Sequence, residues 1–335
     1  MKVIVYIPCH SDFELAVNQA TRIKHDFELL KIESVFNQIY LEVILSVNSY
    51  LPSQVEKEQA EKICDEIIYN GIGYLADINI ANAFLVALNK KPDILWIFSA
   101  NEILEPGAIK IVLQEFINDK SIDLFVTNAL KINKTFTEKQ IIDPPSGGFC
   151  YGLITGVVYR LDRLFPYLHN GPFMAWTGWS HLAVMQSAMD ALGGLKVKTV
   201  PLEMIYKEGE REIDTISKYG HSLYGMLILG SIFKSSKRDS RKFVRKFVLK
   251  RFYSWHMYSR NWKYPGQLVS KDNYLGWNQG IAESLIWESS QIMYVFYKVV
   301  KVIPFRKIRK LQRALFKKLE IRFLKFILNY NREFQ

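Results

Sequence analysis

Short apolar runs alternate with longer segments of helical periodicity along the first 130 residues. Apolar runs rich in β-branched residues predict strands at residues 3–8, 40–47, 66–69, 93–99 and 123–127. The intervening segments predict helices at residues 12–30, 56–66, 78–88 and 106–116. Strands that alternate with helices in this order predict an α/β fold, with a mostly parallel sheet flanked by helices.

The pattern changes after residue 130. A strand is expected at residues 152–160, followed by an aromatic, glycine-broken loop at residues 171–180 and a helix that ends near Gly193, a favourable C-cap residue. Beyond this helix the pattern becomes mainly helical. We therefore expect an α/β domain at residues 1–210 and a helical region at residues 211–335.

Polar residues follow three of the predicted strands. They are Pro8 and His10 after the first strand, Asn48 after the second, and Asn101 and Glu102 after the strand at residues 93–99. In parallel sheets, ligands bind beyond the carboxyl ends of the strands, so these groups are expected to converge on one crevice. Asn82, near the start of a predicted helix, is a further candidate. Helix capping is the alternative role for Asn82, Asn101 and Glu102.

Basic residues concentrate in the last third of the chain. The 335 residues carry 44 Lys and Arg against 33 Asp and Glu, a net charge of +11. Residues 234–263 hold eleven basic residues and one acid, and residues 298–335 hold twelve basic residues and two acids. The rest of the chain is mildly acidic, so the segregated charge indicates an anionic surface as partner, either phospholipid or nucleic acid. Nucleic acid is the weaker alternative, because the basic segments carry no recognised motif.

The last basic segment also carries an apolar stripe at three- and four-residue spacing, formed by Ile308, Leu311, Leu315, Leu319, Phe323 and Phe326. This pattern is typical of a basic amphipathic helix on anionic lipid, and docking onto the protein's own body is the alternative. No apolar stretch reaches the roughly 18 residues of a membrane-spanning helix, and the run at residues 3–7 is too short for a signal peptide. Three cysteines without a CxxC spacing favour a reducing, cytoplasmic location.

Four segments together resemble the nucleotide-sugar-binding half of a family 2 glycosyltransferase with the GT-A fold. They read IPCHSD at residues 7–12, ILSVNS at 44–49, DINIANAF at 77–84 and ILWIFSANEILEPGAI at 94–109. Two later segments, GLITGVVYR at 152–160 and WTGWSHLAV at 176–184, lie where that family has its acceptor-side strand and catalytic loop. The resemblance covers about residues 1–205 and is nearest to bacterial O-antigen and capsule transferases of the abequosyltransferase type.

The resemblance implies a nucleotide-sugar donor bound by Pro8, His10, Asn48, Asn82, Asn101 and Glu102. The family holds Mg²⁺ or Mn²⁺ with an aspartate pair, and the corresponding positions here are Asn101 and Glu102. An amide and a carboxylate oxygen are both acceptable ligands for these ions. An acidic residue common after the second strand of the family is replaced by Val47, which leaves Asn48 as the polar candidate for the nucleotide.

The resemblance also implies a general base in the acceptor loop, where the family usually has a carboxylate. Residues 176–181 contain no acid, so His181 is the candidate base. A helix N-terminus disfavours imidazolium, and neutral imidazole is the form that a base requires. The alternative is a histidine that packs against Trp179 or caps the helix. Asp143 and Glu208 are reserve candidates for the base.

Other residues near these segments have two interpretations each. Trp176 and Trp179 suit either the wall of a sugar site or the core, and Lys207 and Arg211 suit either a diphosphate contact or ordinary surface charge.

The resemblance implies transfer of a hexosyl or deoxyhexosyl group, with inversion, to a lipid-linked oligosaccharide in lipopolysaccharide O-antigen or capsule synthesis. The enzyme is then expected on the inner face of the bacterial cytoplasmic membrane. A non-catalytic GT-A protein that scaffolds a glycan-assembly complex is the alternative.

Overall fold

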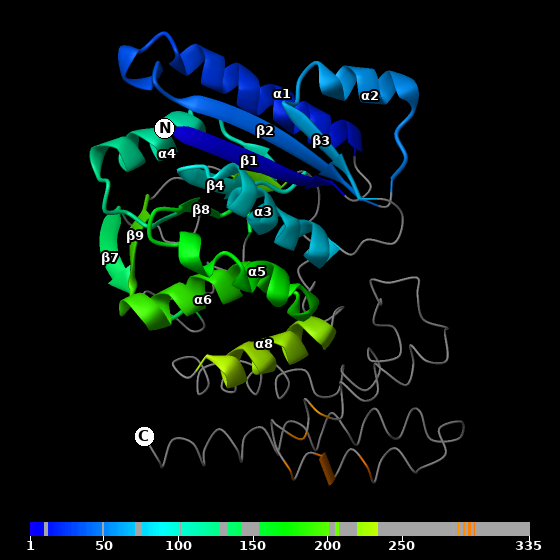
Figure 1. Ribbon diagram of the computed structural model, residues 1–335, viewed down its shortest axis with the longest axis vertical. Helices are drawn as coiled ribbons and strands as arrows, with labels where there is room; N and C mark the ends of the chain where they lie inside the picture. Colours follow the sequence, from blue (N-terminus) through cyan, green and yellow to red (C-terminus); the bar gives the residue numbers. More distant parts are fainter. Residues whose placement is uncertain are drawn as a thin grey trace, which may run out of the picture.

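The computed structural model describes residues 1–9, 13–48, 50–70, 76–100, 102–127, 133–141, 154–200, 205–207 and 220–233, with six single residues between Ser284 and Lys298. An eight-stranded sheet lies at the centre, with helices on both faces (Figure 1). The spatial order of its strands is β3-β2-β1-β4-β8-β6-β9-β7. This arrangement confirms the predicted α/β class.

The strands of this sheet are β1 (Lys2–Cys9), β2 (Tyr40–Val47), β3 (Glu66–Tyr69), β4 (Ile94–Ile97), β6 (Leu124–Val126), β7 (Lys134–Glu138), β8 (Val157–Arg160) and β9 (Leu195–Thr199). Four of its strand pairs are parallel and three are antiparallel. Only β7 and β8 run against the others, so β1, β2, β3, β4, β6 and β9 all end at one edge. We call this the carboxyl edge and the opposite one the amino edge.

The helices are α1 (Phe13–Leu30), α2 (Gln54–Glu61), α3 (Ala76–Lys90), α4 (Ala108–Asn118), α5 (Asn170–Phe173), α6 (Ser180–Leu192) and α8 (Gly220–Ile232). Among the described residues, short 3-10 turns lie at Ser34–Phe36, Phe165–Tyr167 and Ala175–Thr177. A second sheet pairs β5 (Glu102–Leu104) with β10 (Ile205–Lys207). Among the helices that the structure describes, none combines the length and the apolar character needed to cross a bilayer.

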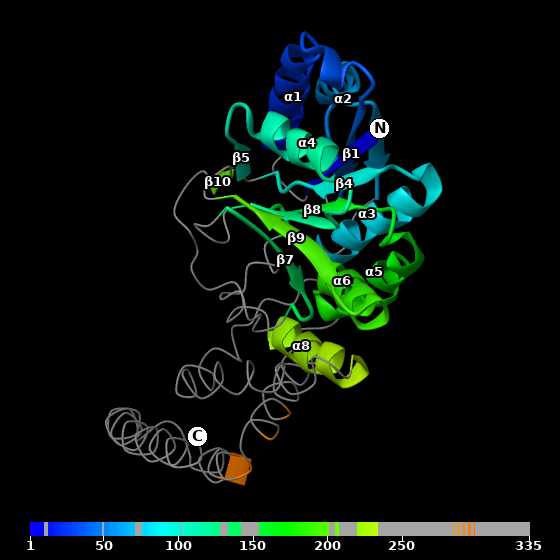
Figure 2. The same ribbon diagram turned by 90° about the vertical axis from the view of Figure 1, so that its left-hand side faces the viewer.

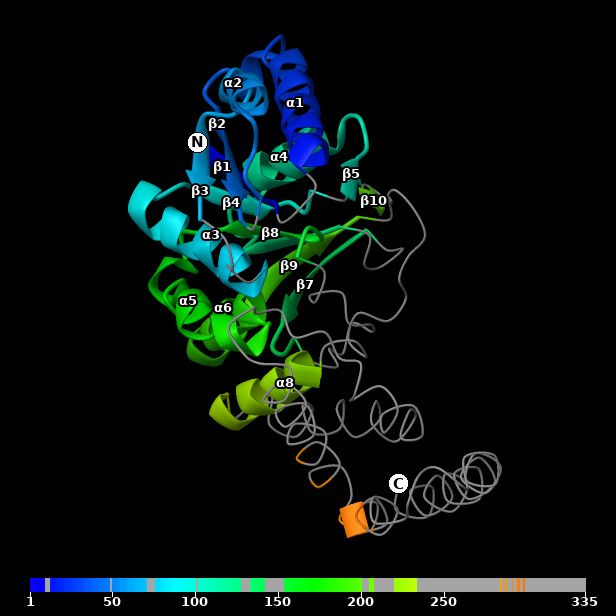
Figure 3. The ribbon, with the colours of Figure 1, turned by 90° about the vertical axis from the view of Figure 1, so that its right-hand side faces the viewer.

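Each face of the main sheet carries its own apolar core. In β1, Val3, Val5 and Ile7 pack with residues of α1 and α4, whereas Ile4 and Tyr6 pack with residues of α3 and α6. Figures 2 and 3 show α1, α2 and α4 on one side of the sheet and α3, α5 and α6 on the other. Because both faces are covered, the central strands are continuous apolar runs rather than alternating ones.

Most predicted elements are confirmed within one to three residues. The helix expected at 56–66 begins earlier, at Gln54, because Ser53 and Glu56 form a capping box, and it ends at Glu61, five residues before the predicted end. Gly193, with a φ of 75°, caps α6 as predicted. The loop expected at residues 171–180 was wrong, since α5 and the 3-10 turn at Ala175–Thr177 occupy most of it. Packing of α5 against α3 and α6 outweighs the weak helix propensity of this segment.

Four of the described strands were missed, namely β5, β7, β9 and β10, and the strand expected at 152–160 begins at Val157. β7 is short and partly exposed, and its Lys, Thr and Glu side chains give a weak strand signal. Of the predicted helical region at 211–335, α8 lies among the described residues. The apolar stripe of residues 308–326 lies outside them.

Candidate functional site

The carboxyl edge collects uncharged polar residues. The backbone N–H of Asn48, directly after β2, donates to the carbonyl oxygen of Cys9 at 2.9 Å, and that of Asn70, directly after β3, donates to Val47 at 2.9 Å. Pro8 is paired in register with Ser46 of the neighbouring strand. The predicted convergence of Pro8 and Asn48 is therefore observed in the backbone of two adjacent strands.

Asn79 of α3 is the centre of a buried hydrogen-bond network beneath this edge. Its Oδ1 accepts from the hydroxyl of Tyr6 at 2.9 Å and from Ser46 Oγ at 2.5 Å. Its Nδ2 donates to the carbonyl oxygen of Ser46 at 2.9 Å and to Asn48 Oδ1 at 2.8 Å. Asn79, Ser46 and Asn48 are each exposed by 1% or less. Both ends of the Asn79 amide are thus satisfied, as a buried amide requires.

The network continues toward the surface through two half-buried asparagines. Asn70 Nδ2 donates to Ser46 Oγ at 2.8 Å and makes a longer contact of 3.4 Å with Asn79 Oδ1. Asn82 Nδ2 in turn donates to Asn70 Oδ1 at 3.4 Å. Side chains from β1, β2, the end of β3 and α3 are therefore joined in one set.

The sequence pattern predicts Asn48 and Asn82 for this site but not Tyr6, Asn70 or Asn79. Two signals were available. Asn70 follows a strand just as Asn48 does, and Asn79 precedes Asn82 by three residues, so both lie on one face of the helix. Neither signal reveals Tyr6, which reads as an ordinary core aromatic.

The end of β4 is fixed by Thr155, which is itself buried. The backbone N–H of Ser99 donates to Thr155 Oγ1 at 2.9 Å, and Trp96 Nε1 donates to the carbonyl oxygen of Thr155 at 2.8 Å. This clamp holds the segment that leads to Glu102 against the start of β8. Glu102 N–H donates back to Ser99 at 3.2 Å, which closes a turn between them.

Glu102 is the first residue of β5, and its Oε2 atom is buried. Backbone pairing with β10 places Lys207 opposite Glu102. Asn101, the other predicted metal ligand, lies outside the described residues. Within the described part of the chain, no three His, Cys, Asp or Glu residues gather as a metal site would need. One carboxylate still suits Mg²⁺, which commonly uses one or two carboxylates together with substrate phosphates and water.

His181 is the second residue of α6, as predicted. Its ring is 1% exposed and lies 5.9 Å from the Trp179 ring, centroid to centroid, at an interplanar angle of 47°. Trp179 belongs to the core, being 7% exposed. A base positioned by the tryptophan and a histidine packed in the core both require this contact, so the role of His181 stays a prediction.

The turn before His181 is covered by α8. A Cβ on Gly225 of α8 would lie 2.0 Å from the carbonyl oxygen of Thr177, so only glycine permits this close approach of the two backbones. Thr177 Oγ1 donates to Met174 at 2.7 Å and accepts from the Trp179 N–H at 3.1 Å. The predicted catalytic loop is therefore held in place from both sides.

Several predicted residues lie outside the described part of the chain. They are His10, Asn101, Asp143, Glu208, Arg211 and the side chains of Trp176 and Lys207.

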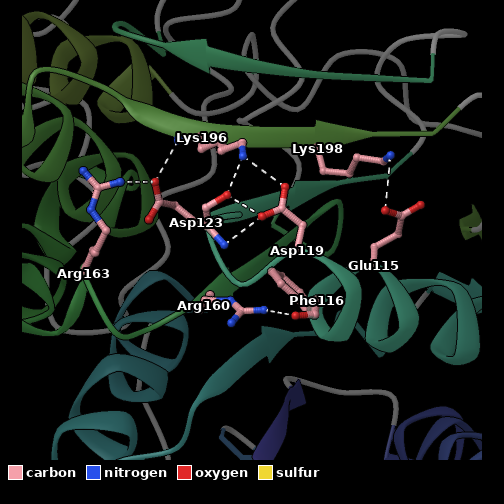
Figure 4. A network of polar contacts seen from close by, with 9 residues as sticks. Glu115, Phe116, Asp119, Asp123, Arg160, Arg163, Lys196 and Lys198 are labelled. Carbon is pink, nitrogen blue, oxygen red and sulfur yellow. Dashed lines mark hydrogen bonds and ion pairs between the residues drawn. The ribbon is translucent and has the colours of Figure 1, made fainter. Parts of the chain in front are cut away.

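The amino edge instead collects charged side chains, as Figure 4 shows for the ends of β6, β8 and β9. Asp123 Oδ2 accepts from Arg163 Nη1 at 2.8 Å and from the Lys196 backbone N–H at 2.7 Å. Lys196 Nζ lies 3.0 Å from Asp119 Oδ2. Arg160 donates to the Phe116 carbonyl oxygen and lies over its ring. Because these groups lie at the amino ends of the parallel strands, away from the carboxyl ends where ligands bind in such sheets, we assign them to the scaffold.

Comparisons with known proteins identify the fold. No protein-family model and no curated protein sequence matches this chain. The structure of S. aureus TarS 1-349 is similar with a TM-score of 0.51 and 10% identity, over 88% of this chain and 82% of that chain. S. aureus TarS in a longer form gives a TM-score of 0.52 and 12% identity, over 88% of this chain and 50% of that chain.

The complex of S. aureus TarS 1-349 with UDP gives a TM-score of 0.50 and 12% identity, over 85% of this chain and 81% of that chain. At such low identity the likeness is one of fold. The chain has the mixed α/β, Rossmann-like GT-A fold of glycosyltransferases, with a mostly parallel sheet flanked by helices, as its sequence predicts.

Proposed function

We propose that this protein is a glycosyltransferase that takes a sugar from a nucleotide-sugar donor bound at the carboxyl edge. The amide network centred on Asn79 carries the proposal, because it lies where ligands bind in sheets of this kind and consists of neutral donors and acceptors. Its half-buried outer amides, Asn70 and Asn82, suit the hydroxyls and base edges of a nucleoside. The UDP bound by S. aureus TarS 1-349 supports a uridine nucleotide as the first ligand to test.

The diphosphate of the donor is assigned to the region of Glu102. Mg²⁺ or Mn²⁺ there, held by Glu102 and Asn101 together with phosphate oxygens, would neutralise charge on the leaving nucleoside diphosphate. The paired backbone of β5 and β10 fixes the position of Glu102. Pro8, His10, Asn48 and Asn82 complete the donor site in this proposal.

His181 is the proposed general base. It removes the proton from the acceptor hydroxyl as that oxygen attacks the anomeric carbon, and the bond from that carbon to the diphosphate breaks, with inversion. The proton ends on the imidazole and the electron pair leaves with the nucleoside diphosphate. General-base catalysis of this kind contributes about 10²- to 10⁴-fold to the rate.

The acceptor is proposed to be a lipid-linked oligosaccharide of O-antigen or capsule synthesis, as for transferases of the abequosyltransferase type. The basic segments at residues 234–263 and 298–335 support a peripheral position on the cytoplasmic face of the membrane, since each Lys or Arg near anionic lipid contributes about 1 kcal/mol. Residues 1–210 would hold the donor and residues 211–335 the membrane contact.

Liposome flotation tests the membrane part. Full-length protein should float with anionic vesicles at low salt and less at high salt, whereas protein lacking residues 305–335 should stay in solution. The truncated form should still bind nucleotide. Equal flotation of both forms would make the tail a structural element.

A non-catalytic scaffold of the same fold is the second candidate, favoured by the replacement of the family's aspartate pair with Asn101 and Glu102. Thermal shift with nucleoside diphosphates, with and without Mg²⁺ or Mn²⁺, tests the donor site. A ligand at 100 times its Kd should stabilise the fold by about 2.7 kcal/mol. Binding accompanied by donor hydrolysis or transfer supports the enzyme, binding without either supports the scaffold, and absence of any binding contradicts the enzyme.

A further inference from the structure

The orientation of the Asn79 side chain is fixed by a backbone group. The carbonyl oxygen of Ser46 can only accept, so the Asn79 atom 2.9 Å from it is the nitrogen, Nδ2. The same nitrogen donates its second hydrogen to Asn48 Oδ1, with 2.8 Å between Nδ2 and Oδ1. Oδ1 of Asn79 is then the acceptor for the Tyr6 and Ser46 hydroxyls.

The orientation of the Asn79 amide determines the orientations of the outer amides, Asn70 and Asn82. Because Asn79 Oδ1 is an acceptor, the part of Asn70 that faces it is the nitrogen, which also donates to Ser46 Oγ. Asn70 Oδ1 therefore lies on the far side of its amide, where it accepts from Asn82 Nδ2. With its nitrogen directed at Asn70, the Asn82 amide turns its carbonyl oxygen away from the network.

We propose that Asn79 is a positioning residue that makes Asn82 present its carbonyl oxygen to the nucleotide, so that Asn82 selects a nucleoside with a hydrogen-bond donor at that point. The inference rests on the proposed function. A carbonyl oxygen repels phosphate oxygens, which are acceptors too, so this subsite belongs to the nucleoside and not to the diphosphate. The group of the nucleoside that donates this hydrogen bond is a ribose hydroxyl or the imide N–H of the base.

Calorimetry with UDP, 2′-deoxy-UDP, 3′-deoxy-UDP and N3-methyl-UDP distinguishes the two ribose hydroxyls and the imide N–H as the group that Asn82 recognises. The wild-type protein should bind one of the three modified ligands about 3- to 10-fold more weakly than UDP, as expected for one neutral hydrogen bond. Asn82→Ala should bind UDP and that ligand equally well. Asn118→Ala, an exposed asparagine at the far end of α4, is the matched control and should keep the wild-type ratio.

Asn79→Ala tests the positioning role, since it frees both outer amides to rotate. It should lower the ratio between UDP and the discriminated ligand toward one, whereas Tyr6→Phe should keep the ratio, because the Ser46 carbonyl still fixes the Asn79 amide. Circular dichroism checks that each variant is folded. If Asn79→Ala does not fold, Asn82→Ala decides the matter, because Asn82 is half-buried.

Equal binding of all four nucleotides by the wild-type protein would overturn the inference, and so would an Asn82→Ala variant that keeps the discrimination. Both results leave the proposed function standing, since UDP is still bound. If no nucleoside diphosphate binds the wild-type protein, the proposed function and this inference fail together.

Discussion

The two edges of the main sheet satisfy their buried polar groups with different chemistry. At the carboxyl edge, Asn48, Asn70, Asn79 and Ser46 satisfy one another as neutral groups. At the amino edge the polar groups are ionised. Glu42, 5% exposed, contacts Lys2 and Lys90, and other carboxylates pair with arginine and lysine (Figure 4).

The difference separates a site from a scaffold. Ion pairs at the amino edge lie away from the strand ends where ligands bind in sheets of this kind, so we assign them to the scaffold. A neutral network keeps its donors and acceptors without a charge that must be matched, and it can orient a side chain toward a ligand at little cost in desolvation. Isosteric exchanges between amide and carboxylate at the two edges test this contrast directly.

The largest effect is expected for Asn79→Asp at the carboxyl edge. The new carboxylate would replace Nδ2 beside two acceptors, Ser46 O and Asn48 Oδ1, in a position exposed by only 1%. An uncompensated buried charge costs about 3–5 kcal/mol, and urea unfolding at pH 7 measures it. A loss below about 1 kcal/mol would show that the network tolerates charge.

A comparable effect, on rate and not on stability, is expected for His181→Ala. If His181 is the base, turnover should fall by about 10²- to 10⁴-fold while nucleotide affinity is kept. α6 leads into β9, which begins at the amino edge, so the C-terminal end of α6 lies near that edge. His181, near the start of α6, therefore lies toward the carboxyl edge. His169→Ala, an exposed histidine on the same side of the sheet, is the control. Near-normal turnover would pass the role to Asp143 or Glu208, and unfolding would favour the packed histidine.

Glu102→Gln should weaken nucleotide binding about tenfold in Mg²⁺ and leave binding in EDTA unchanged, because it removes a charge from the proposed metal site but keeps the shape of the side chain. Calorimetry with UDP in both buffers is the measurement. Glu105→Gln, three residues further and exposed, is the matched control. Equal affinity of wild type and Glu102→Gln in both buffers would remove the metal from the proposal.

Asp123→Asn at the amino edge should cost about 1 kcal/mol. Burial raises the pKa of Asp123 above its ordinary value, so the carboxylate is already desolvated, and the amide oxygen can still accept from the Lys196 N–H. What is lost is the pair with Arg163, whose side chain is 47% exposed. A loss as large as that of Asn79→Asp would erase the contrast between the edges.

The smallest effect is a pH dependence. Hydrogen bonds from Ser121 and then Lys196 lower the pKa of Asp119 from 3.8 to about 2. Because the folded value lies below the unfolded one, this stabilisation is present above pH 4 and is lost as the pH falls toward 2. Thermal melts of wild type and Asp119→Asn between pH 5 and pH 2 should converge at the acid end. Parallel curves would contradict the assignment.

Local signals were enough to predict the order of the helices and main-sheet strands from β1 to β6, and part of the candidate site. Apolar runs located β1, β2 and β3 within a residue or two, and strand ends indicated Asn48 as a candidate site residue. The short α5 was missed because its Asn, Gly and Pro residues read as a loop, whereas packing against α3 and α6 makes it a helix. Strand β9 has the sequence LKVKT, in which Leu195, Val197 and Thr199 alternate with lysines. This alternation, which matches the buried and half-buried positions of the strand, could have been recognised in the sequence.

The sequence by itself determined the class of fold, the polar character of the strand ends and the segregation of basic residues into the last third of the chain. These follow from periodicity and composition, which are local properties. Only the tertiary structure decided how Tyr6, Ser46, Asn70 and Asn79 meet, because parallel strands and the helix between them bring together residues up to 73 positions apart. It also decided which end of each amide faces outward, since that depends on the Ser46 carbonyl oxygen, a backbone atom whose direction no side-chain pattern records.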